Sequence, residues 1–131
     1  PEAVLAECGH PSAPVPVRQW IGNLPEWLAV MADPAVPVPR FPFLDLGERA
    51  ALELALQEHA DAVLIDEARG RRAAHGAGLI AVGTIGILSE AARRGWLDYE
   101  GTVSSLMRET NFRATPGVIR LGRDHSRWEP G

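Results

Sequence analysis

The sequence predicts an α/β protein with a layered fold and a mainly parallel sheet. Two short, continuously apolar runs carry this prediction, VLI at 63–65 and LIAV at 79–82. Each run ends in residues that open a segment with a helical pattern, so strand and helix alternate along this part of the chain. Strands that are apolar throughout are typical of parallel sheets with both faces covered.

Proline sets the N-terminal third apart from the rest. Eight of the eleven prolines fall between residues 11 and 42, a density that excludes long helices there and leaves short extended pieces. We expect an edge strand at 35–41, AVPVPRF. Trp20 and Trp27 are expected to anchor this region onto a core, with base stacking as the alternative.

From residue 44 onward, helical spacing and short apolar runs alternate, with clear starts and stops. Thr84 is expected to cap the third helix of this region, and Gly95 to end it. We expect no helix beyond residue 110 and a flexible tail at 122–131, with Trp128 as a contact residue, in a single domain over 1–131. The predicted elements are helix 45–59, strand 62–66, helix 67–76, strand 79–84, helix 85–95 and helix 103–110.

The composition is that of an ordinary globular protein of 131 residues, with 46% hydrophobic and 23% charged residues. No apolar stretch would span a bilayer and no leader opens the chain, so we expect a cytoplasmic protein that does not contact membranes. Cys8 is the single cysteine, which excludes an internal disulfide. A net charge of −4 argues against a broad nucleic-acid-coating surface but leaves room for a local basic patch.

Several familiar sites are excluded by the sequence. The glycines at 76–78 and 83–86 do not complete a dinucleotide-binding fingerprint, and a phosphate-binding P-loop would need a lysine, of which the chain has none. Cys8 and His10 lack a second cysteine for a zinc set. No nucleophilic triad is visible.

Carboxylates remain as candidates for chemistry. Asp66 and Glu67 directly follow the strand run 63–65, at the strand end beyond which α/β proteins collect their ligands. Glu48 lies in the first turn of the preceding helix, and Glu7 lies in the apolar stretch PEAVLAEC. A loose acidic cluster suits Mg²⁺, which combines a few carboxylates with water and substrate phosphate.

Each of these carboxylates also has a purely structural interpretation. Asp45 and Glu48 have the spacing of a capping box. Asp66 would cap the next helix, Glu67 would favour that helix's positive N-terminus, and Glu7 would be an exposed helix residue. Spacing alone leaves both interpretations open.

The order of the motifs resembles a prokaryotic branch of the PIN-domain superfamily that is similar to VapC-type toxin nucleases. Three pieces carry the resemblance: LD-x-GE at 44–48, LIDE-x-x-GR-x-A at 64–73 and GT-x-G-x-L at 83–88. The resemblance covers nearly the whole chain. It implies a three-layer α/β/α fold and a metal-dependent endoribonuclease with an acidic cluster that binds Mg²⁺ or Mn²⁺.

The resemblance also implies roles for individual residues. Glu7 matches the acidic residue of the first conserved helix, Glu48 the one before the LIDE strand, and Asp66 the one at that strand's end. These three would be the catalytic and metal-binding carboxylates, with Glu67 assisting at the metal.

Arg69, Arg71 and Arg72 would neutralise the phosphate backbone of bound RNA next to the metal. The alternative is a solvated helix face or a salt bridge to Glu67.

One departure from the family pattern concerns the start of the chain. Members of this branch begin with a D-[ST]-S-P-L strand whose aspartate is a central ligand, and PEAVLAE corresponds to a segment located after that strand. A gene start assigned too far downstream, a partial sequence and a decayed relative are the three explanations. We expect a chain without that strand to be marginally stable or completed by another chain, because neighbouring strands would have unpaired edges.

The resemblance implies two alternative functions. The first is a PIN-type ribonuclease, the toxin of a toxin–antitoxin pair, with RNA as substrate, a small antitoxin protein that covers the acidic site, and a homodimer or higher oligomer. The second is a non-catalytic PIN-like interaction or nucleic-acid-binding protein with a degenerate metal site.

Overall fold

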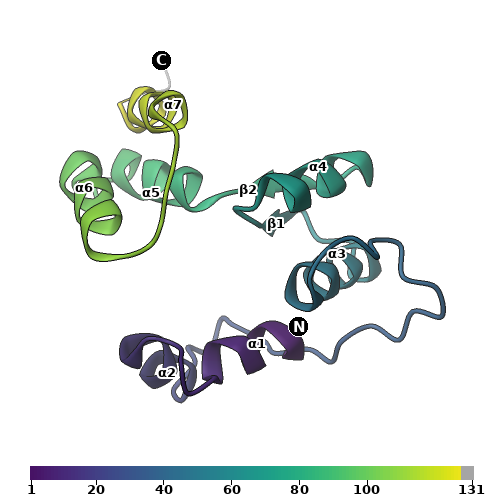
Figure 1. Ribbon diagram of the computed structural model, residues 1–131. Helices are drawn as coiled ribbons and strands as arrows, with labels where there is room; N and C mark the ends of the chain where they lie inside the picture. The colour runs from purple at the N-terminus through teal and green to yellow at the C-terminus, as the bar shows by residue number, and fades with distance from the viewer. Residues whose placement is uncertain (128–131) are drawn as a thin grey trace. The chain divides into compact units, whose positions relative to one another are not determined.

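The computed structural model describes residues 1–127 and divides the chain into two compact units, residues 1–81 and the residues from Val82 onward. Both units are drawn in Figure 1. The elements in chain order are α1 (Glu2–Gly9), α2 (Val15–Ile21), α3 (Leu46–Gln57), β1 (Ala62–Leu64), α4 (Ala68–Gly76), β2 (Ile80–Val82), α5 (Thr84–Arg93), α6 (Tyr99–Glu109) and α7 (Pro116–Ser126).

Helix α1 opens the first unit and packs on α2 and α3. Its first turn has no side-chain cap of its own. A segment about thirty residues later supplies the missing partners, because Asp33 Oδ1 accepts from Ala3 N at 3.0 Å and Met31 O accepts from Glu2 N at 3.0 Å. The chain therefore folds back to hold the start of α1, which is the helix that carries Glu7.

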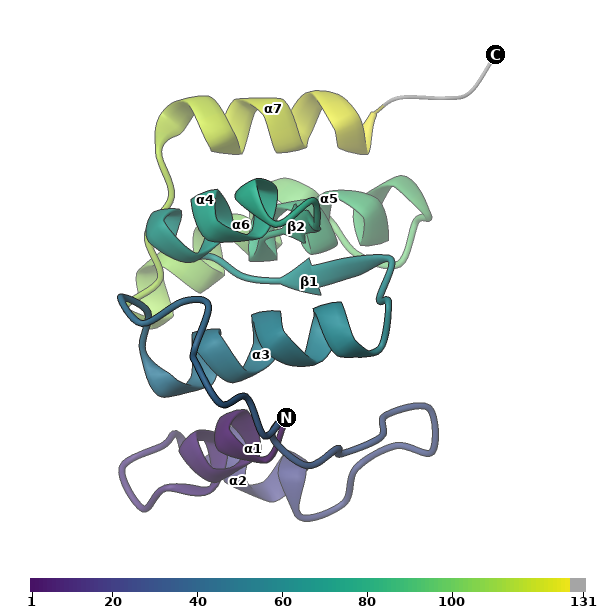
Figure 2. The same ribbon diagram turned by 90° about the vertical axis from the view of Figure 1, so that its right-hand side faces the viewer.

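The centre of the first unit is built from α3, β1, α4 and β2. In Figure 2, β1 lies between α3 and α4 and beside β2, with which it forms a two-stranded sheet. Leu52 of α3 is fully buried in this core. The other buried members of the core are Phe41, Leu44, Ala55, Val63, Ile65, Ala74 and Leu79. The predicted α/β fold with a parallel sheet is confirmed.

Burial along β1 alternates, which differs from the continuously buried strand expected from the sequence. Val63 and Ile65 face the core, whereas Leu64 is 68% exposed; in β2, Ile80 is 63% exposed. Side chains on a strand point to opposite faces in turn. One face of this short sheet is therefore left uncovered within the first unit.

The proline-rich segment is attached to the core by an ion pair rather than by tryptophan. Glu53 of α3 is 97% buried and accepts hydrogen bonds from Arg40 N at 3.0 Å and from Arg40 Nε at 2.8 Å. Trp20 and Trp27 are 49% and 80% exposed, so the expectation that they anchor this region was wrong. The expected strand at 35–41 was also wrong, because those residues are irregular and sit against α3 through Arg40.

The second unit consists of three helices, α5, α6 and α7. The N-cap of α5 is Gly83, so Thr84 is its first helical residue and not its cap as predicted. Gly95 follows the C-cap of α5 with φ +73°, as its predicted role as helix terminator requires. The C-terminal helix was not predicted: α7 is capped by Thr115, whose side chain accepts from Val118 N.

Helix α7 includes residues that the sequence assigned to a flexible tail. It extends to Ser126, and Gly122 is buried within it. Trp128 lies outside the described residues. Ile85, Tyr99 and Val103 form the core that α7 covers.

Candidate metal centre

The candidate site is centred on Glu48, in the first turn of α3. Asp45 caps this helix, because its Oδ1 accepts from Glu48 N at 2.8 Å. The side chain of Glu48 does not complete a capping box: its Oε1 is buried and has no hydrogen-bond partner in the described part of the chain. Helix capping therefore explains Asp45 but leaves the Glu48 carboxylate without a structural role.

The electrostatic environment of Glu48 disfavours its charged form. Burial, then the negative charges of Asp45 and Glu67, raise the pKa of Glu48 above its usual value. Arg69 opposes this effect, and Glu7 adds to it. A carboxylate whose pKa is raised by burial and by like charges is a candidate functional group, because a bound cation would relieve both.

Glu7 is brought next to Glu48 through the start of α3. A Cβ atom built on Gly47 would lie 2.6 Å from Glu7 Oε1, so the carboxylate of Glu7 rests on the residue that precedes Glu48. The packing of α1 on α3 produces this approach. Two residues about forty positions apart in the chain are thereby placed side by side.

The loop between β1 and α4 carries the remaining two carboxylates. Glu67 is the N-cap residue of α4 but its side chain makes no capping hydrogen bond, and its charge acts on Glu48. Asp66 is exposed and continues the alternation in which Leu64 is exposed and Ile65 is buried. It is not among the charges with the largest effect on Glu48. Among the predicted ligands, Glu7 and Glu67 thus act on Glu48 more strongly than Asp66 does.

The arginines of α4 lie in the same neighbourhood. Arg69 Nη1 donates to Phe43 O at 3.5 Å, and its charge is felt by Glu48. Arg71 Nη1 donates to Ile65 O at 3.4 Å, while Arg72 is exposed. No ion pair joins Glu67 to any of the three among residues 1–127, so the predicted salt-bridge alternative does not form there.

These carboxylates do not form a finished coordination shell. Among residues 1–127, no group of three or more Asp, Glu, His or Cys side chains has the geometry to hold a metal ion. The buried, unpartnered Oε1 of Glu48 and the adjacent charges of Glu7 and Glu67 nevertheless fit a divalent cation, because hard cations take carboxylate oxygens together with several waters.

Sequence reasoning missed two residues that shape this site, Gly47 and Gly70. A Cβ atom on Gly70 would lie 2.8 Å from Glu48 Oε1, just as one on Gly47 would meet Glu7. The signal in the sequence is that each glycine is a fixed position of a motif that carries the family resemblance, LD-x-GE or LIDE-x-x-GR-x-A. A single sequence does not reveal that their lack of a side chain is needed by a distant carboxylate.

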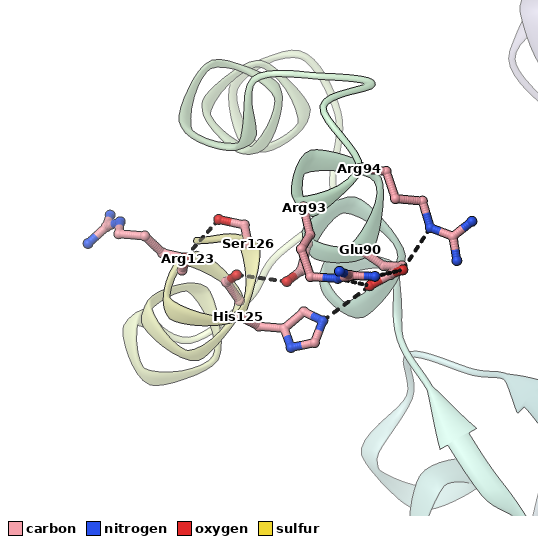
Figure 3. Close-up of polar contacts among 8 residues, drawn as sticks. Glu90, Arg93, Arg94, Arg123, His125 and Ser126 are labelled. Carbon is pink, nitrogen blue, oxygen red and sulfur yellow. Dashed lines mark hydrogen bonds and ion pairs between the residues drawn. The ribbon is translucent and has the colours of Figure 1, made fainter. Parts of the chain in front are cut away.

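In the second unit, Glu90 and Glu100 are paired with arginines. Figure 3 shows Glu90 of α5 in contact with Arg93 of the same helix, with its C-cap residue Arg94, and with His125 of α7. The hydrogen bond from Arg93, then the one from Arg94, hold the pKa of Glu90 far below its usual 4.5. Glu100 is paired in the same way with Arg123, which lowers the pKa of that carboxyl. These groups are neutralised within the fold and are not candidates for a metal.

Comparison with known proteins identifies the family. The family model DUF3368, described as a PIN domain, matches residues 1–123. The chain belongs to this PIN-domain family. No curated protein and no solved structure gives a significant match. None of the helices in residues 1–127 has both the length and the apolar character of a membrane span.

Proposed function

We propose that this PIN-domain protein is a Mg²⁺- or Mn²⁺-dependent endoribonuclease whose metal site is built around Glu48. The observation that carries the proposal is the buried Oε1 of Glu48, which has no hydrogen-bond partner in the described residues. Family membership supports the reaction class, and the excess of negative charge around Glu48 supports the cation.

The residues that would hold the cation are Glu7, Glu48 and Asp66, with Glu67 assisting. Glu48 would supply a buried oxygen, and Glu7 and Glu67 would add the negative charge that attracts a cation. When bound, the cation would lower the pKa of a water and stabilise the charge that develops on the scissile phosphate.

Arg69, Arg71 and Arg72 would bind the RNA backbone. Arg72 is exposed, and within residues 1–127 Arg69 makes one long hydrogen bond, to a backbone carbonyl, so both are available to a phosphate. Their position at the start of α4, next to Glu67, places positive charge beside the acidic residues. This would offset the repulsion between RNA and a site of several carboxylates.

The toxin–antitoxin assignment belongs to the same proposal. A small antitoxin protein would cover the acidic site and present an arginine to it, and the nuclease would act as a homodimer or higher oligomer in the cytoplasm. The negative charges of Asp45, Glu67 and Glu7 around Glu48 support this arrangement, because they would attract a guanidinium as they would attract a metal.

The test is cleavage of a mixed RNA substrate by the full chain with Mn²⁺, compared with EDTA and with the variants Glu48→Gln and Asp66→Asn. Activity should disappear with EDTA and fall at least about 100-fold in Glu48→Gln, because a ligand and not a neighbour is removed. Glu58→Gln is the matched control: this exposed residue lies at the opposite end of α3 and should leave the rate unchanged. Cleavage that persists in Glu48→Gln would reject the proposal.

A second function is favoured by one specific observation, the lack of a three-membered ligand group among the described residues. On this alternative the chain is a non-catalytic PIN-like protein that binds RNA or a partner through the same surface. RNA binding that depends on Arg69 and Arg72 and is unaffected by EDTA, without cleavage, would favour it.

A further inference from the structure

Two glycines of the first unit lie directly against two of the candidate ligands. A methyl group on Gly70 of α4 would lie 2.8 Å from Glu48 Oε1 and would also collide with Ile65 Cδ1. A methyl group on Gly47 of α3 would lie 2.6 Å from Glu7 Oε1 and 3.0 Å from Glu7 Oε2. Both glycines are buried.

Backbone conformation does not explain why glycine stands at these positions. The glycines with positive φ among the described residues are Gly78 and Gly95, so Gly47 and Gly70 have conformations that alanine adopts readily. Alanine is also the better helix former. What remains to account for glycine is the close approach of Glu7 at position 47, and of both Ile65 and the Glu48 carboxylate at position 70.

A third glycine of α4 provides the contrast. Gly76, at the last position of that helix, has no atom within 4 Å of the place where a Cβ would stand. Space is therefore restricted at the end of α4 that faces the acidic residues, and open at the other end.

We propose that Gly70 and Gly47 are positioning residues that hold the carboxylates of Glu48 and Glu7 at the metal site by leaving room for them. The inference rests on the proposed function for the identity of the ligand, a divalent cation, but the contacts themselves need no metal. Gly70 acts through Glu48, and Gly47 acts through Glu7; neither glycine touches substrate.

The two glycines should respond differently to a methyl group. At Gly70 the methyl displaces both a carboxylate and the core residue Ile65, so stability and metal binding fall together. At Gly47 only the end of an exposed glutamate has to move, so metal binding should fall without a loss in melting temperature.

The first experiment measures melting temperature without metal in a double-mutant cycle. To reduce the collision with the core, Gly70→Ala is combined with Ile65→Val, which lacks Cδ1 but keeps the γ carbon 3.0 Å from the methyl position. The pair is compared with Ile65→Val alone. In the Ile65→Val background, Gly70→Ala should lower the melting temperature. The loss should be smaller when Glu48→Ala is also present, because the methyl group then has no carboxylate to displace. Equal losses with and without Glu48 would overturn the assignment of Gly70.

The second experiment measures binding of Mn²⁺ alone, by electron paramagnetic resonance of the free ion, to the same full-length variants. Gly70→Ala/Ile65→Val and Gly47→Ala should bind about 10-fold more weakly or worse, while Ile65→Val and the control Gly76→Ala should bind like the original chain. Unchanged Mn²⁺ binding in both glycine variants would overturn the proposal. If the original chain binds no Mn²⁺, the proposed function fails, and the metal-free cycle still decides whether Gly70 positions Glu48.

Discussion

Glu48 in the first unit and Glu90 in the second are both helix glutamates, yet their surroundings are opposite. Glu90 accepts hydrogen bonds from two arginines, and these hold its pKa well below the usual value. Glu48 has a buried oxygen without a partner in the described residues, and burial and like charges raise its pKa. Glu90 is thus neutralised by arginines of its own unit, whereas Glu48 has no such partner among the described residues.

The two units also differ in net charge. Residues 1–81 contain 6 arginines and 11 acidic residues, a net charge of −5, while the remainder contains 7 arginines and 6 acidic residues, a net charge of +1. An excess of carboxylates is costly unless something compensates it. The contrast singles out Glu48 as a carboxylate whose buried oxygen is not paired within the described residues.

Glycine offers the test with the largest expected effect on stability. Gly122→Ala in α7 should lower the free energy of unfolding by about 1–3 kcal/mol through overpacking. Its methyl would collide with Tyr99 Oη and lie 2.7 Å from Ile85 Cγ2. Chemical denaturation measures this, with Gly117→Ala in the same helix as the control, because the nearest atom there is 4.0 Å away. Equal stability of the two variants would show that the second unit is not closely packed at Gly122.

Acid should weaken the second unit through Glu90. A carboxylate whose pKa is lowered on folding stabilises the protein above its unfolded value near 4.5, and this contribution is lost as the pH falls toward the folded value. Melting temperatures from pH 7 down to pH 2.5 should therefore decline less steeply in Glu90→Gln, which is already destabilised at pH 7. A parallel decline in both proteins would mean that the arginine pairs do not form in solution.

Glu48→Gln should have a smaller effect of the opposite sign in metal-free buffer. The raised pKa means that ionised Glu48 costs stability at neutral pH, and that this cost vanishes as the pH falls below about 4.5. The neutral amide should then melt slightly higher at pH 7, and the difference should disappear in acid. A lower melting temperature for Glu48→Gln at pH 7 would mean that ionised Glu48 stabilises the protein, as Glu90 does.

A substitution on the exposed face of β1 should have the smallest effect on stability of the four predictions. Leu64 is 68% exposed, so Leu64→Thr should alter the free energy of unfolding by no more than about 0.5 kcal/mol. Val63→Thr, one residue earlier and buried, should cost clearly more because its hydroxyl enters the core. If the two substitutions cost the same, the outer face of β1 is covered in solution.

The elements from α3 to α5 were predictable because capping residues, glycine and apolar runs mark where they begin and end. Asp45 caps α3 and Gly95 ends α5, and apolar runs flank α4, so order and type from α3 to α5 are explained by local pattern. Helices α2 and α7 were missed, and both carry proline in the first turn, where it favours a helix rather than breaking one.

The site was predictable only in part. Glu48 was found through its motif, and its unpaired oxygen supports that choice, but its ligand role stays a prediction. The nearness of Gly70 to Glu48 depends on how α4 packs against α3, a tertiary distance without a local signature. The exposure of Trp27 was unpredictable for the same reason, since a tryptophan in a proline-rich segment is compatible with either a buried or an exposed place.

The cap that Asp33 places on α1 ties the candidate site to a segment that contributes no ligand to it. A helix of eight residues does not persist alone in water, and the amide of Ala3 finds its partner only after the chain has returned from residue 33. The position of Glu7 beside Gly47 therefore depends on a contact between the start of α1 and a segment thirty residues later in the chain. Hydrogen exchange at Ala3 would report this contact directly, and Asp33→Ala should speed that exchange while the amides of α3 keep their protection.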